Sequence, residues 1–412
     1  MKISRRNLIQ AAGVAALASP APSPAATMPD NKFEGKDTPK ICLSLGDGGL
    51  GGFGAGGNRG GGNRGGAAAQ SNAPATPAPP AAGSTSPFSP EQTQARRLLQ
   101  LGVSHALSGG GRVPWEESRL KEQIDRWKGL GITLGNLMIS GFDNAIYARQ
   151  GRDEDIEKVI ASVQAAGKAG LPVIEYNWYA HRAMEGYFEE EGRAGAGWTG
   201  FDYERLVDDN GNKTPFKDLP ALEREGAHTL DEMWANIIYF LKKVIPECEK
   251  AGVRLALHPN DPPAPVSRKS QQIMGTVDGW KHLIDIVKSP SNGITFDCGV
   301  TREMGQDPVE VCRYFASRDR INHVHFRNVK VKKPYERYTE VFIDEGENNM
   351  FAVMRELVRH KYSHMIYPEH PRAIDYDRER GRIGGYPGGG AYAAFAYNVG
   401  YARAMLQAAL TA

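Results

Sequence analysis

The chain has 412 residues, with 50 Lys and Arg against 48 Asp and Glu, four cysteines and 48 glycines. This length is enough for one large domain or for two ordinary domains. The formal charge of +2 provides no general attraction to nucleic acid or to anionic lipid, which argues against a dedicated DNA-binding protein. The cysteines are too few and too scattered for a disulfide scaffold, so a hydrophobic core must stabilise the fold.

Residues 1–30 are typical of an export signal. Arg5 and Arg6 precede a short, weakly apolar stretch over 11–18, and small residues over 21–26 offer cleavage sites. The pattern predicts a twin-arginine signal and therefore a periplasmic or secreted protein; a frayed basic N-terminus is the alternative. No later stretch reaches 18 apolar residues, so no membrane span is expected.

A low-complexity tract follows the first predicted strand. Residues 46–66 are mostly glycine, and the chain to residue 90 is rich in Pro, Ala and Ser. Such sequence buries too little apolar surface to offset its chain entropy, so we expect a flexible insertion over 46–90. Residues 46–51 match the dinucleotide pattern G-x-G-x-x-G, but no helix opens directly after them and no acidic residue follows at the required distance. Residues 31–412 are expected to form a single domain around this insertion.

Short β-prone runs alternate with amphipathic runs along the rest of the chain. In one of the helical runs, Ile156, Val159 and Val163 share a face, and Thr229 with Glu232 forms a capping box ahead of another. The predicted strands are 40–45, 102–107, 132–139, 172–178, 253–257, 293–297, 321–326 and 363–367, and the predicted helices are 90–100, 116–129, 153–168, 230–250, 277–288, 308–317, 347–360 and 391–409. This α/β alternation predicts a (β/α)₈ TIM barrel; a doubly wound open sheet is the alternative.

Four potential metal ligands follow four consecutive predicted strands. These residues are His258, Cys298, His325 and Glu369. Because barrel sites lie at the carboxyl ends of the strands, we expect them to meet around one divalent transition ion such as Mn²⁺, Zn²⁺ or Fe²⁺, whereas Ca²⁺ and Mg²⁺ prefer oxygen ligands. Purely structural roles are one alternative, and a thiolate of Cys298 paired with His325 as its base is another. His323, on the same strand face as His325, is interpreted as a core residue or as one that orients a ligand.

Over residues 100–410 the sequence resembles the mannonate dehydratase family, metal-dependent members of the xylose-isomerase-like barrels. The motifs that carry this resemblance include Tyr176-Asn177-Trp178, His258-Pro259-Asn260-Asp261-Pro262-Pro263, Cys298-Gly299, His325-Phe326-Arg327-Asn328, Pro368-Glu369-His370 and Gly385-Tyr386. The resemblance implies Mn²⁺ held at His258, Cys298, His325 and Glu369, and conversion of D-mannonate to 2-keto-3-deoxygluconate. The family has Asp where Glu369 and Asn260 stand here, and it lacks the export signal and the glycine tract.

Dehydration of a sugar acid requires a proton to leave the carbon beside the carboxylate while the neighbouring hydroxyl departs. A metal ion stabilises the enediolate that develops, and an acid and a base must flank the substrate. His370 and Tyr386 match family positions for proton transfer, and Asp261 is a further candidate. Candidates for binding the acid are Asn177, Arg327, Arg372 and His105, with weaker indications for Arg302, His181 and Trp178.

The leading hypothesis is an exported, metal-dependent sugar-acid dehydratase whose partner is a small sugar acid, with no nucleic acid or membrane involved. A sugar isomerase or epimerase on the same barrel is an alternative, because such enzymes share the enediolate intermediate. A non-catalytic periplasmic sugar-acid-binding protein is a second alternative, and a barrel endonuclease is a distant third because no basic surface for tracking phosphates is evident. The sequence leaves open whether the chain forms a homo-oligomer.

Overall fold

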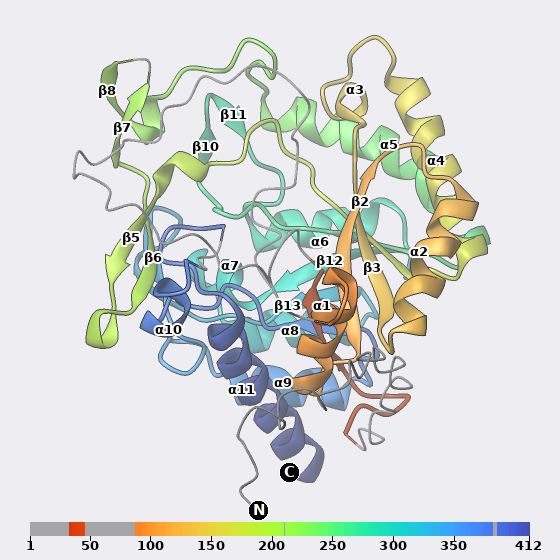
Figure 1. Ribbon diagram of the computed structural model, residues 1–412. Helices are drawn as coiled ribbons and strands as arrows, with labels where there is room; N and C mark the ends of the chain where they lie inside the picture. The colour runs from red at the N-terminus through yellow and green to blue at the C-terminus, as the bar shows by residue number, and fades with distance from the viewer. Residues whose placement is uncertain (1–32, 46–86, 210, 382–384) are drawn as a thin grey trace, which may run out of the picture.

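The computed structural model describes residues 33–45, 87–209, 211–381 and 385–412. Its centre is a closed barrel of eight parallel strands in the order β1-β16-β13-β12-β9-β4-β3-β2, surrounded by helices (Figure 1). This closure confirms the predicted TIM barrel and excludes the doubly wound sheet, because a doubly wound sheet has two free edges. The predicted export signal and most of the predicted insertion over 46–90 lie outside the described residues.

Each predicted strand and helix overlaps one element of the barrel. The barrel strands are β1 (Lys40–Ser44), β2 (His105–Arg112), β3 (Thr133–Ser140), β4 (Val173–Tyr176), β9 (Arg254–Leu257), β12 (Asn292–Asp297), β13 (Ile321–His325) and β16 (Met365–Tyr367). The outer helices are α1 (Pro90–Gln100), α2 (Glu117–Gly129), α4 (Arg152–Ala169), α5 (Leu230–Ala251), α6 (Val277–Ile286), α8 (Pro308–Ala316), α9 (Met350–Arg359) and α11 (Tyr392–Thr411). Shorter helices are α3 (Asp143–Ile146), α7 (Cys298–Glu303) and α10 (Asp375–Arg378).

Helix α5 shows how local sequence sets the element boundaries. The Thr229 side chain accepts a hydrogen bond from the Glu232 backbone N–H, and the Glu232 carboxylate accepts one from the Thr229 N–H, so the predicted capping box is confirmed. Gly252 ends the helix in the left-handed conformation. Between these ends Met233, Ile237 and Leu241 are buried, and this apolar face attaches α5 to the barrel. None of the described helices has the length and apolar composition that crossing a bilayer requires.

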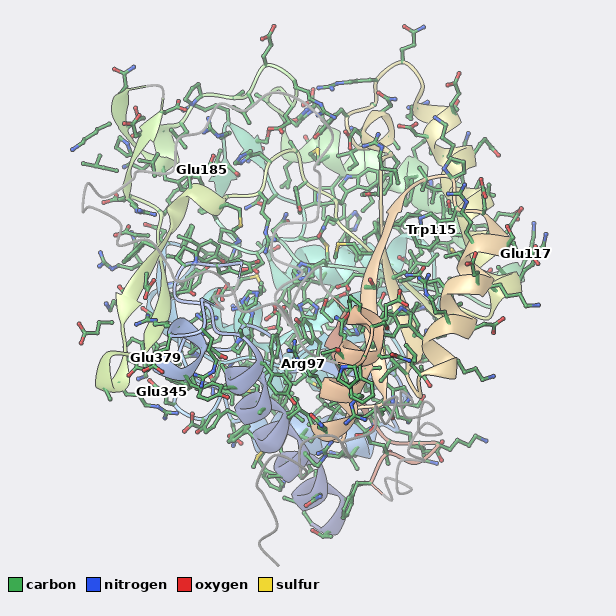
Figure 2. The ribbon with its side chains drawn as sticks, viewed as in Figure 1. Arg97, Trp115, Glu117, Glu185, Glu345 and Glu379 are labelled. Carbon is green, nitrogen blue, oxygen red and sulfur yellow. The ribbon has the colours of Figure 1, made fainter. Side chains whose placement is uncertain are left out.

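Strand β2 differs most from its prediction. It was predicted over 102–107 but runs from His105 to Arg112, through three consecutive glycines. A Cβ at Gly110 would lie 2.1 Å from the Trp115 ring, so glycine lets this indole, labelled in Figure 2, pack against the strand. Because β2 begins at His105, this imidazole lies at the amino end of the barrel, where it is 3.8 Å from Glu34. The predicted substrate-binding role of His105 is therefore wrong.

Additional sheets lie in the loops that follow the barrel strands, and the sequence did not predict them. A four-stranded antiparallel sheet has the order β14-β15-β6-β5, and two hairpins pair β7 with β8 and β10 with β11 (Figure 1, left and top). Their bounds are β5 (Tyr187–Glu191), β6 (Gly197–Asp202), β7 (Leu206–Asp209), β8 (Asn212–Pro215), β10 (Val266–Ser267), β11 (Ser270–Gln271), β14 (Val329–Lys333) and β15 (Arg337–Glu340). Around Tyr187, Phe201 and Tyr338 they form a second hydrophobic core that includes Tyr386.

Ion pairs connect these loops to one another. The Glu185 carboxylate, labelled in Figure 2, lies 2.8 Å from Nε of Arg268 and 3.3 Å from Nε2 of His181. His181 also bonds through Nδ1 to the Ser267 hydroxyl at 2.8 Å. The loop after β4 is therefore attached to the β10–β11 hairpin, and together they form one wall above the carboxyl ends of the strands.

Candidate metal centre

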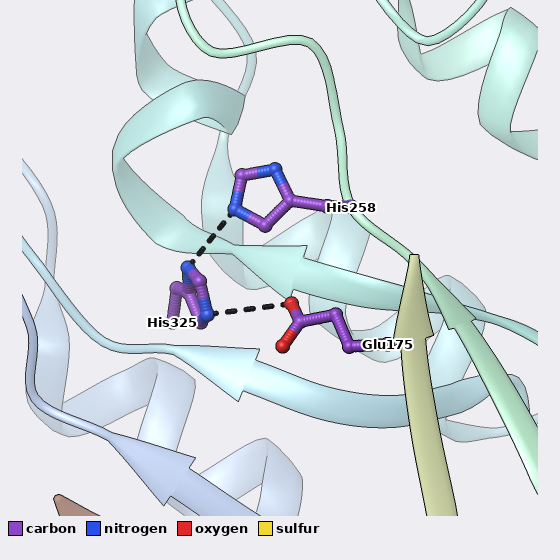
Figure 3. A group of neighbouring side chains, drawn as sticks. All are labelled: Glu175, His258 and His325. Carbon is purple, nitrogen blue, oxygen red and sulfur yellow. Dashed lines mark hydrogen bonds and ion pairs between the residues drawn. The ribbon is translucent and has the colours of Figure 1, made fainter. Parts of the chain in front are cut away.

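Three of the four predicted ligands converge at the carboxyl ends of neighbouring strands. His258 follows β9, His325 ends β13 and Glu369 follows β16. Nε2 of His258 lies 3.2 Å from Nδ1 of His325, and the same Nδ1 lies 3.0 Å from Oε1 of Glu369. All three side chains are buried. Figure 3 shows the two imidazoles facing each other.

The structure does not bring Cys298, the fourth predicted ligand, into this cluster. Its thiol is buried in the main hydrophobic core and belongs to none of the groups of His, Cys, Asp and Glu side chains found among the described residues. Burial, with the nearby Asp297 charge, raises the pKa of the thiol well above its ordinary value. This burial also disfavours the alternative in which Cys298 is a thiolate nucleophile.

Two carboxylates that the sequence analysis did not single out lie beside His325. Glu175, in β4, places Oε1 3.5 Å from Nε2 of His325 (Figure 3), and Asp297, at the end of β12, places Oδ2 3.8 Å from Nδ1. Ligand atoms of Glu175, His258 and His325 lie within 4.8 Å of one another, as do those of Asp297, His325 and Glu369. The available signals were an acidic residue inside an apolar strand and a carboxylate directly before Cys298.

A hydrogen bond at His258 and an ion pair at His325 set which nitrogen of each imidazole faces the cluster. Nδ1 of His258 contacts the Pro259 carbonyl oxygen at 2.7 Å, which leaves Nε2 directed at His325. Glu175 faces Nε2 of His325, which leaves Nδ1 directed at Glu369. Such outer contacts orient histidine ligands in metal sites.

Polar residues inside the barrel form hydrogen bonds to Glu175 and pack against the inner side of His325. Glu175 accepts hydrogen bonds from the Thr295 hydroxyl at 2.8 Å and from the Asn136 amide at 3.1 Å. The ring of His323 is buried and lies edge-on to that of His325, 5.1 Å between centroids. This placement agrees with the interpretation of His323 as a residue packed beneath a ligand.

The electrostatics of the cluster favour a bound cation. Burial opposes protonation of His325, but the carboxylates of Glu369, Glu175 and Asp297 outweigh burial and raise its pKa to about 9. Burial and the neighbouring His325 lower the pKa of His258 to about 3, which keeps this imidazole neutral. Two imidazole nitrogens with adjacent carboxylate oxygens are a donor set suited to divalent transition ions, so these residues fit a metal.

Arg327 is not available to a substrate, contrary to its predicted role. Its side chain is only 2% exposed, and it lies among five carboxylates. The distances from guanidinium nitrogen to carboxylate oxygen are 3.0 Å to Asp297, 2.6 Å to Glu303, 3.2 Å to Glu369, 3.4 Å to Asp261 and 3.6 Å to Glu340. Arg327 therefore compensates buried negative charge and orients Asp297 and Glu369.

The guanidinium of Arg372 is also committed within the protein, although Arg372 lines the pocket. The side chain is 1% exposed and donates to Glu340 Oε2 at 3.0 Å, to the His370 carbonyl oxygen at 2.8 Å and to the Thr199 hydroxyl. Glu340 lies in β15 and Thr199 in β6, so the sheet that the sequence did not predict supplies the partners of Arg372. The predicted contact between this guanidinium and a substrate carboxylate is therefore wrong, because the donors of Arg372, like those of Arg327, are bonded within the protein.

A cavity of about 650 Å³, open to solvent, leads from the protein surface to the metal cluster. Predicted residues that line it are Asn177, His258, Asp261, His325, Glu369, His370, Arg372 and Tyr386. Arg302 instead pairs with Glu347 at 2.7 Å, and Trp178 is fully buried against Phe142 and Phe240. Among the described residues, His181 is likewise absent from the lining.

His370 and Tyr386 lie together on the wall of this cavity. Their ring centroids are 4.3 Å apart, and Nδ1 of His370 lies 2.8 Å from Oε2 of Glu340. The phenol oxygen of Tyr386 accepts a hydrogen bond from Arg182. Burial raises the pKa of Tyr386 well above its ordinary value, although the Arg182 charge opposes this shift.

Arg182 is a lining residue that the sequence analysis missed. It lies in the loop after β4, donates through Nε to the Asp261 carbonyl oxygen at 2.8 Å and through Nη2 to Asp261 Oδ2 at 3.0 Å, and keeps 21% of its side chain exposed. Asp261 Oδ1 accepts a hydrogen bond from the Tyr187 hydroxyl at 2.7 Å. Both carboxylate oxygens of Asp261 are thus engaged, and its arginine neighbours lower its pKa despite burial.

Comparison with known proteins gives matches over most of the chain. The family model for D-mannonate dehydratase (UxuA) matches residues 108–411. The mannonate dehydratase of Thermotoga maritima is 29% identical over 325 residues, which are 69% of this chain and 85% of that protein. The mannonate dehydratase of Streptococcus equi subsp. zooepidemicus is 30% identical over 244 residues, 56% of this chain and 67% of that protein.

Solved structures share the barrel fold. The crystal structure of mannonate dehydratase from Streptococcus suis serotype 2 superposes with a TM-score of 0.65 at 23% identity, covering 80% of this chain and 93% of that one. A xylose isomerase-like TIM barrel protein from Mycobacterium smegmatis superposes with a TM-score of 0.50 at 14% identity, covering 78% and 90%. The family match over 108–411 contains every residue of the metal cluster, and the chain accordingly belongs to the D-mannonate dehydratase family of hydro-lyases.

Proposed function

We propose that this enzyme removes water from D-mannonate or a related aldonate to give a 2-keto-3-deoxy acid. The observation that carries the proposal is that His258, His325 and Glu369 lie next to one another, beside His370 and Tyr386, in the lining of one open cavity. The family membership supports a sugar acid as the substrate class. The cavity supports the proposal further, because its lining brings the candidate metal ligands next to His370 and Tyr386, the two candidates for proton transfer.

His258, His325, Glu369 and Asp297 are the residues that would hold a divalent metal ion. Mn²⁺ is proposed from the family resemblance, and Zn²⁺ and Fe²⁺ suit the same donors. A bound ion supplies Lewis-acid stabilisation of the negative charge that develops on the substrate carboxylate.

The resemblance also assigns Cys298 as a ligand, and the spectrum of Co²⁺-loaded protein tests this assignment. An intense thiolate-to-cobalt band that Cys298→Ala abolishes supports Cys298 as a ligand. The absence of such a band assigns the fourth ligand position to Asp297, whose carboxylate lies 3.8 Å from Nδ1 of His325.

Arg182 and Asn177 are proposed to bind the acid in place of Arg327 and Arg372. Nε and Nη2 of Arg182 hold Asp261 and Tyr386, and no bond to its Nη1 occurs among the described residues. A guanidinium fixed on one side presents its remaining donors in a defined direction, which suits carboxylate binding. Asp261 therefore acts by orienting Arg182 and does not itself transfer a proton.

His370 and Tyr386 are proposed as the base and the acid. Glu340 orients the His370 ring through Nδ1, and removal of the proton beside the substrate carboxylate produces the enediolate. The raised pKa of Tyr386 keeps the phenol protonated, so it has a proton to donate to the departing hydroxyl. Tyr386 and His370 lie on the same wall, and this closeness lets them act on adjacent carbons.

Incubation of the metal-loaded protein with D-mannonate tests the proposal. Mass spectrometry is expected to show a product that has lost one water, with the reactivity of a 2-keto-3-deoxy acid. A product of unchanged mass would identify an isomerase or epimerase instead. Saturable binding of D-mannonate without turnover under Mn²⁺, Zn²⁺, Fe²⁺ or Co²⁺ would identify a non-catalytic binding protein.

Export to the periplasm is proposed from the sequence alone. Arg5 and Arg6 stand at the positions that a twin-arginine signal requires. Fractionation of cells that express the full chain and an Arg5→Lys, Arg6→Lys variant tests this proposal. Retention of the variant in the cytoplasm, with the unaltered chain in the periplasm, is the expected result.

A further inference from the structure

A second cavity, of about 690 Å³ and open to solvent, lies at the same end of the barrel as the metal cluster. It is lined by the end of β2, the turn after β3, residues of α3 and α4 with the loop between them, and Arg224 in the loop before α5; α3 and α4 lie at the upper right of Figure 1. Its charged lining consists of Arg112, Arg149, Lys158, Arg224, Asp143 and Asp155. The lining thus contains four cations and two carboxylates.

The two carboxylates are already engaged with two of the cations. Asp143 lies 2.9 Å from Nη2 of Arg224, and Asp155 lies 3.2 Å from Nζ of Lys158. Asp155 is buried, and its second oxygen accepts a hydrogen bond from the Asn144 backbone N–H at 3.1 Å. The carboxylates therefore belong to the wall of the cavity.

Arg112 and Arg149 provide the surplus positive charge. Arg149 donates to the backbone carbonyl oxygens of Arg224 and Glu225 and lies over the Tyr147 ring. Within the described part of the chain, no carboxylate pairs with Arg112 or Arg149. Two guanidinium groups on one cavity wall, each without an acidic partner, are suited to bidentate binding of an anion.

Glycine at position 141 allows Arg112 to lie along this wall. Gly141 has a φ of +87°, and a Cβ there would lie 2.9 Å from Cβ and 3.1 Å from Nε of Arg112. A side chain at this position would therefore displace Arg112. The Arg112 side chain, at the end of β2, thus packs directly against the turn after β3.

A third, smaller cavity lies between the cationic cavity and the metal-site cavity and shares lining residues with each. Gly141 and Asp143 line both the cationic cavity and the connecting cavity, and Asn177 lines both the connecting cavity and the metal-site cavity. The order of shared residues therefore places the cationic cavity on the Asn177 side of the metal-site cavity. D-Mannonate has a single carboxylate and so offers no second anionic group to the far end.

We propose that the Arg112–Arg149 cavity binds a second anionic group, a carboxylate or a phosphate, carried by a substrate longer or more highly charged than a simple aldonate. This inference rests on the proposed function for the end of the substrate that reacts at the metal cluster. The anion site itself depends only on Arg112 and Arg149, so it can be tested by binding measurements without turnover.

Calorimetric titration with inorganic phosphate tests the anion site. We expect one saturable site in the unaltered protein and a loss of affinity of about tenfold or more in the Arg112→Ser, Arg149→Ser double variant. Arg119→Ser is the matched control, because Arg119 on α2 is 81% exposed and pairs with Glu116 away from the cavity. The proposal is overturned if the double variant binds phosphate normally, or if His258→Ala abolishes binding, which would place the anion at the metal cluster.

Affinities for three acids then test whether the anion is part of the substrate. D-Mannonate, D-mannonate 6-phosphate and a disaccharide aldonate that ends in a uronate are titrated into both proteins. The double variant is expected to bind either the 6-phosphate or the uronate-terminated acid about tenfold more weakly than the unaltered protein does. Which of the two loses affinity shows whether the site takes a phosphate or a carboxylate. The affinity for D-mannonate is expected to be the same in both proteins. Equal affinities for all three acids in both proteins would refute a substrate-borne anion. If phosphate binds as expected but no acid is dehydrated, the proposed function fails while the anion site stands.

Discussion

Nε2 of His325 lies 3.5 Å from Oε1 of Glu175, on the side of the ring opposite the nitrogen that faces His258 and Glu369. One carboxylate inside the barrel thus directs the imidazole of a neighbouring strand towards the metal cluster. Thr295 and Asn136 hold that carboxylate in turn, so four strands of the barrel determine the direction of one ligand nitrogen.

Glu175→Gln is expected to lower metal affinity by about 10-fold to 100-fold, the usual effect of removing a residue that orients a histidine ligand. The amide keeps the volume but loses the charge that faces Nε2 of His325. Metal titration of the purified protein measures the change. Glu157→Gln, at an exposed position on α4, is the control. Equal affinities in the two variants would contradict the orienting role.

Metal affinity is expected to rise with pH from neutrality up to about pH 9. The pKa of His325 is raised to about 9, so a metal ion must displace a proton from this ring below that pH, whereas the pKa of His258, lowered to about 3, adds no such competition. One displaced proton corresponds to about a tenfold gain in affinity per pH unit. Titrations at pH 7 and pH 8 with the same ion test this, and an affinity independent of pH would show that His325 is already neutral.

Arg327→Met is expected to lower the free energy of unfolding by about 3–5 kcal/mol, because it leaves several buried carboxylates without their cation. Urea denaturation measures this change. Arg302→Met is the control, since Arg302 is partly exposed and, among the residues that the structure describes, pairs only with Glu347; exposed pairs contribute about 0–1 kcal/mol. If Arg327→Met instead leaves stability intact and raises KM for the acid, the original assignment of Arg327 to substrate binding is restored.

Tyr386→Phe is expected to lower kcat by about 100-fold to 10,000-fold, the contribution of a general acid, with little change in metal affinity. The phenylalanine keeps the ring contact with His370 and removes only the hydroxyl that Arg182 contacts. Steady-state kinetics and metal titration on the same preparation separate the two effects. Tyr376→Phe, on an exposed side chain of α10, is the matched control.

Arg182→Lys is expected to raise KM for the acid by about tenfold or more, because an ammonium cannot hold Asp261 and a carboxylate with the same fork of donors. The charge is retained, so a purely electrostatic role predicts little change. Kinetics at constant metal concentration give the result. An unchanged KM with a lower kcat would assign Arg182 to positioning Tyr386 alone.

The barrel and three of its proposed ligands followed from local patterns. Apolar runs of strand length alternate with helices that carry their own start and stop signals, and parallel strands direct the side chains at their carboxyl ends to one mouth. His258, His325 and Glu369 each follow or end such a run, so their convergence could be read from the order of elements alone.

The boundaries of β2 could not be read in this way. The predicted strand ended at residue 107, yet the strand continues to Arg112, and Trp115 packs where a side chain at Gly110 would be. This longer strand moved His105 to the opposite end of the barrel from its predicted position. The extent of β2 depends on the packing of Trp115 against Gly110, and Trp115 lies beyond the strand. A pattern within the strand itself therefore does not reveal it.

The sequence by itself determined the order of strands and helices, and hence most of the residues at the mouth of the barrel, His105 excepted, because hydrophobic periodicity and capping act over a few neighbouring residues. Only the tertiary structure decided which of those residues face the cavity. The guanidinium groups of Arg327 and Arg372 pair with the buried carboxylates of Glu303 on α7 and Glu340 on β15, whereas Arg182 keeps part of its side chain exposed at the cavity wall. Pairings such as these join segments far apart in the chain, and the energy of a buried charge depends on every partner at once.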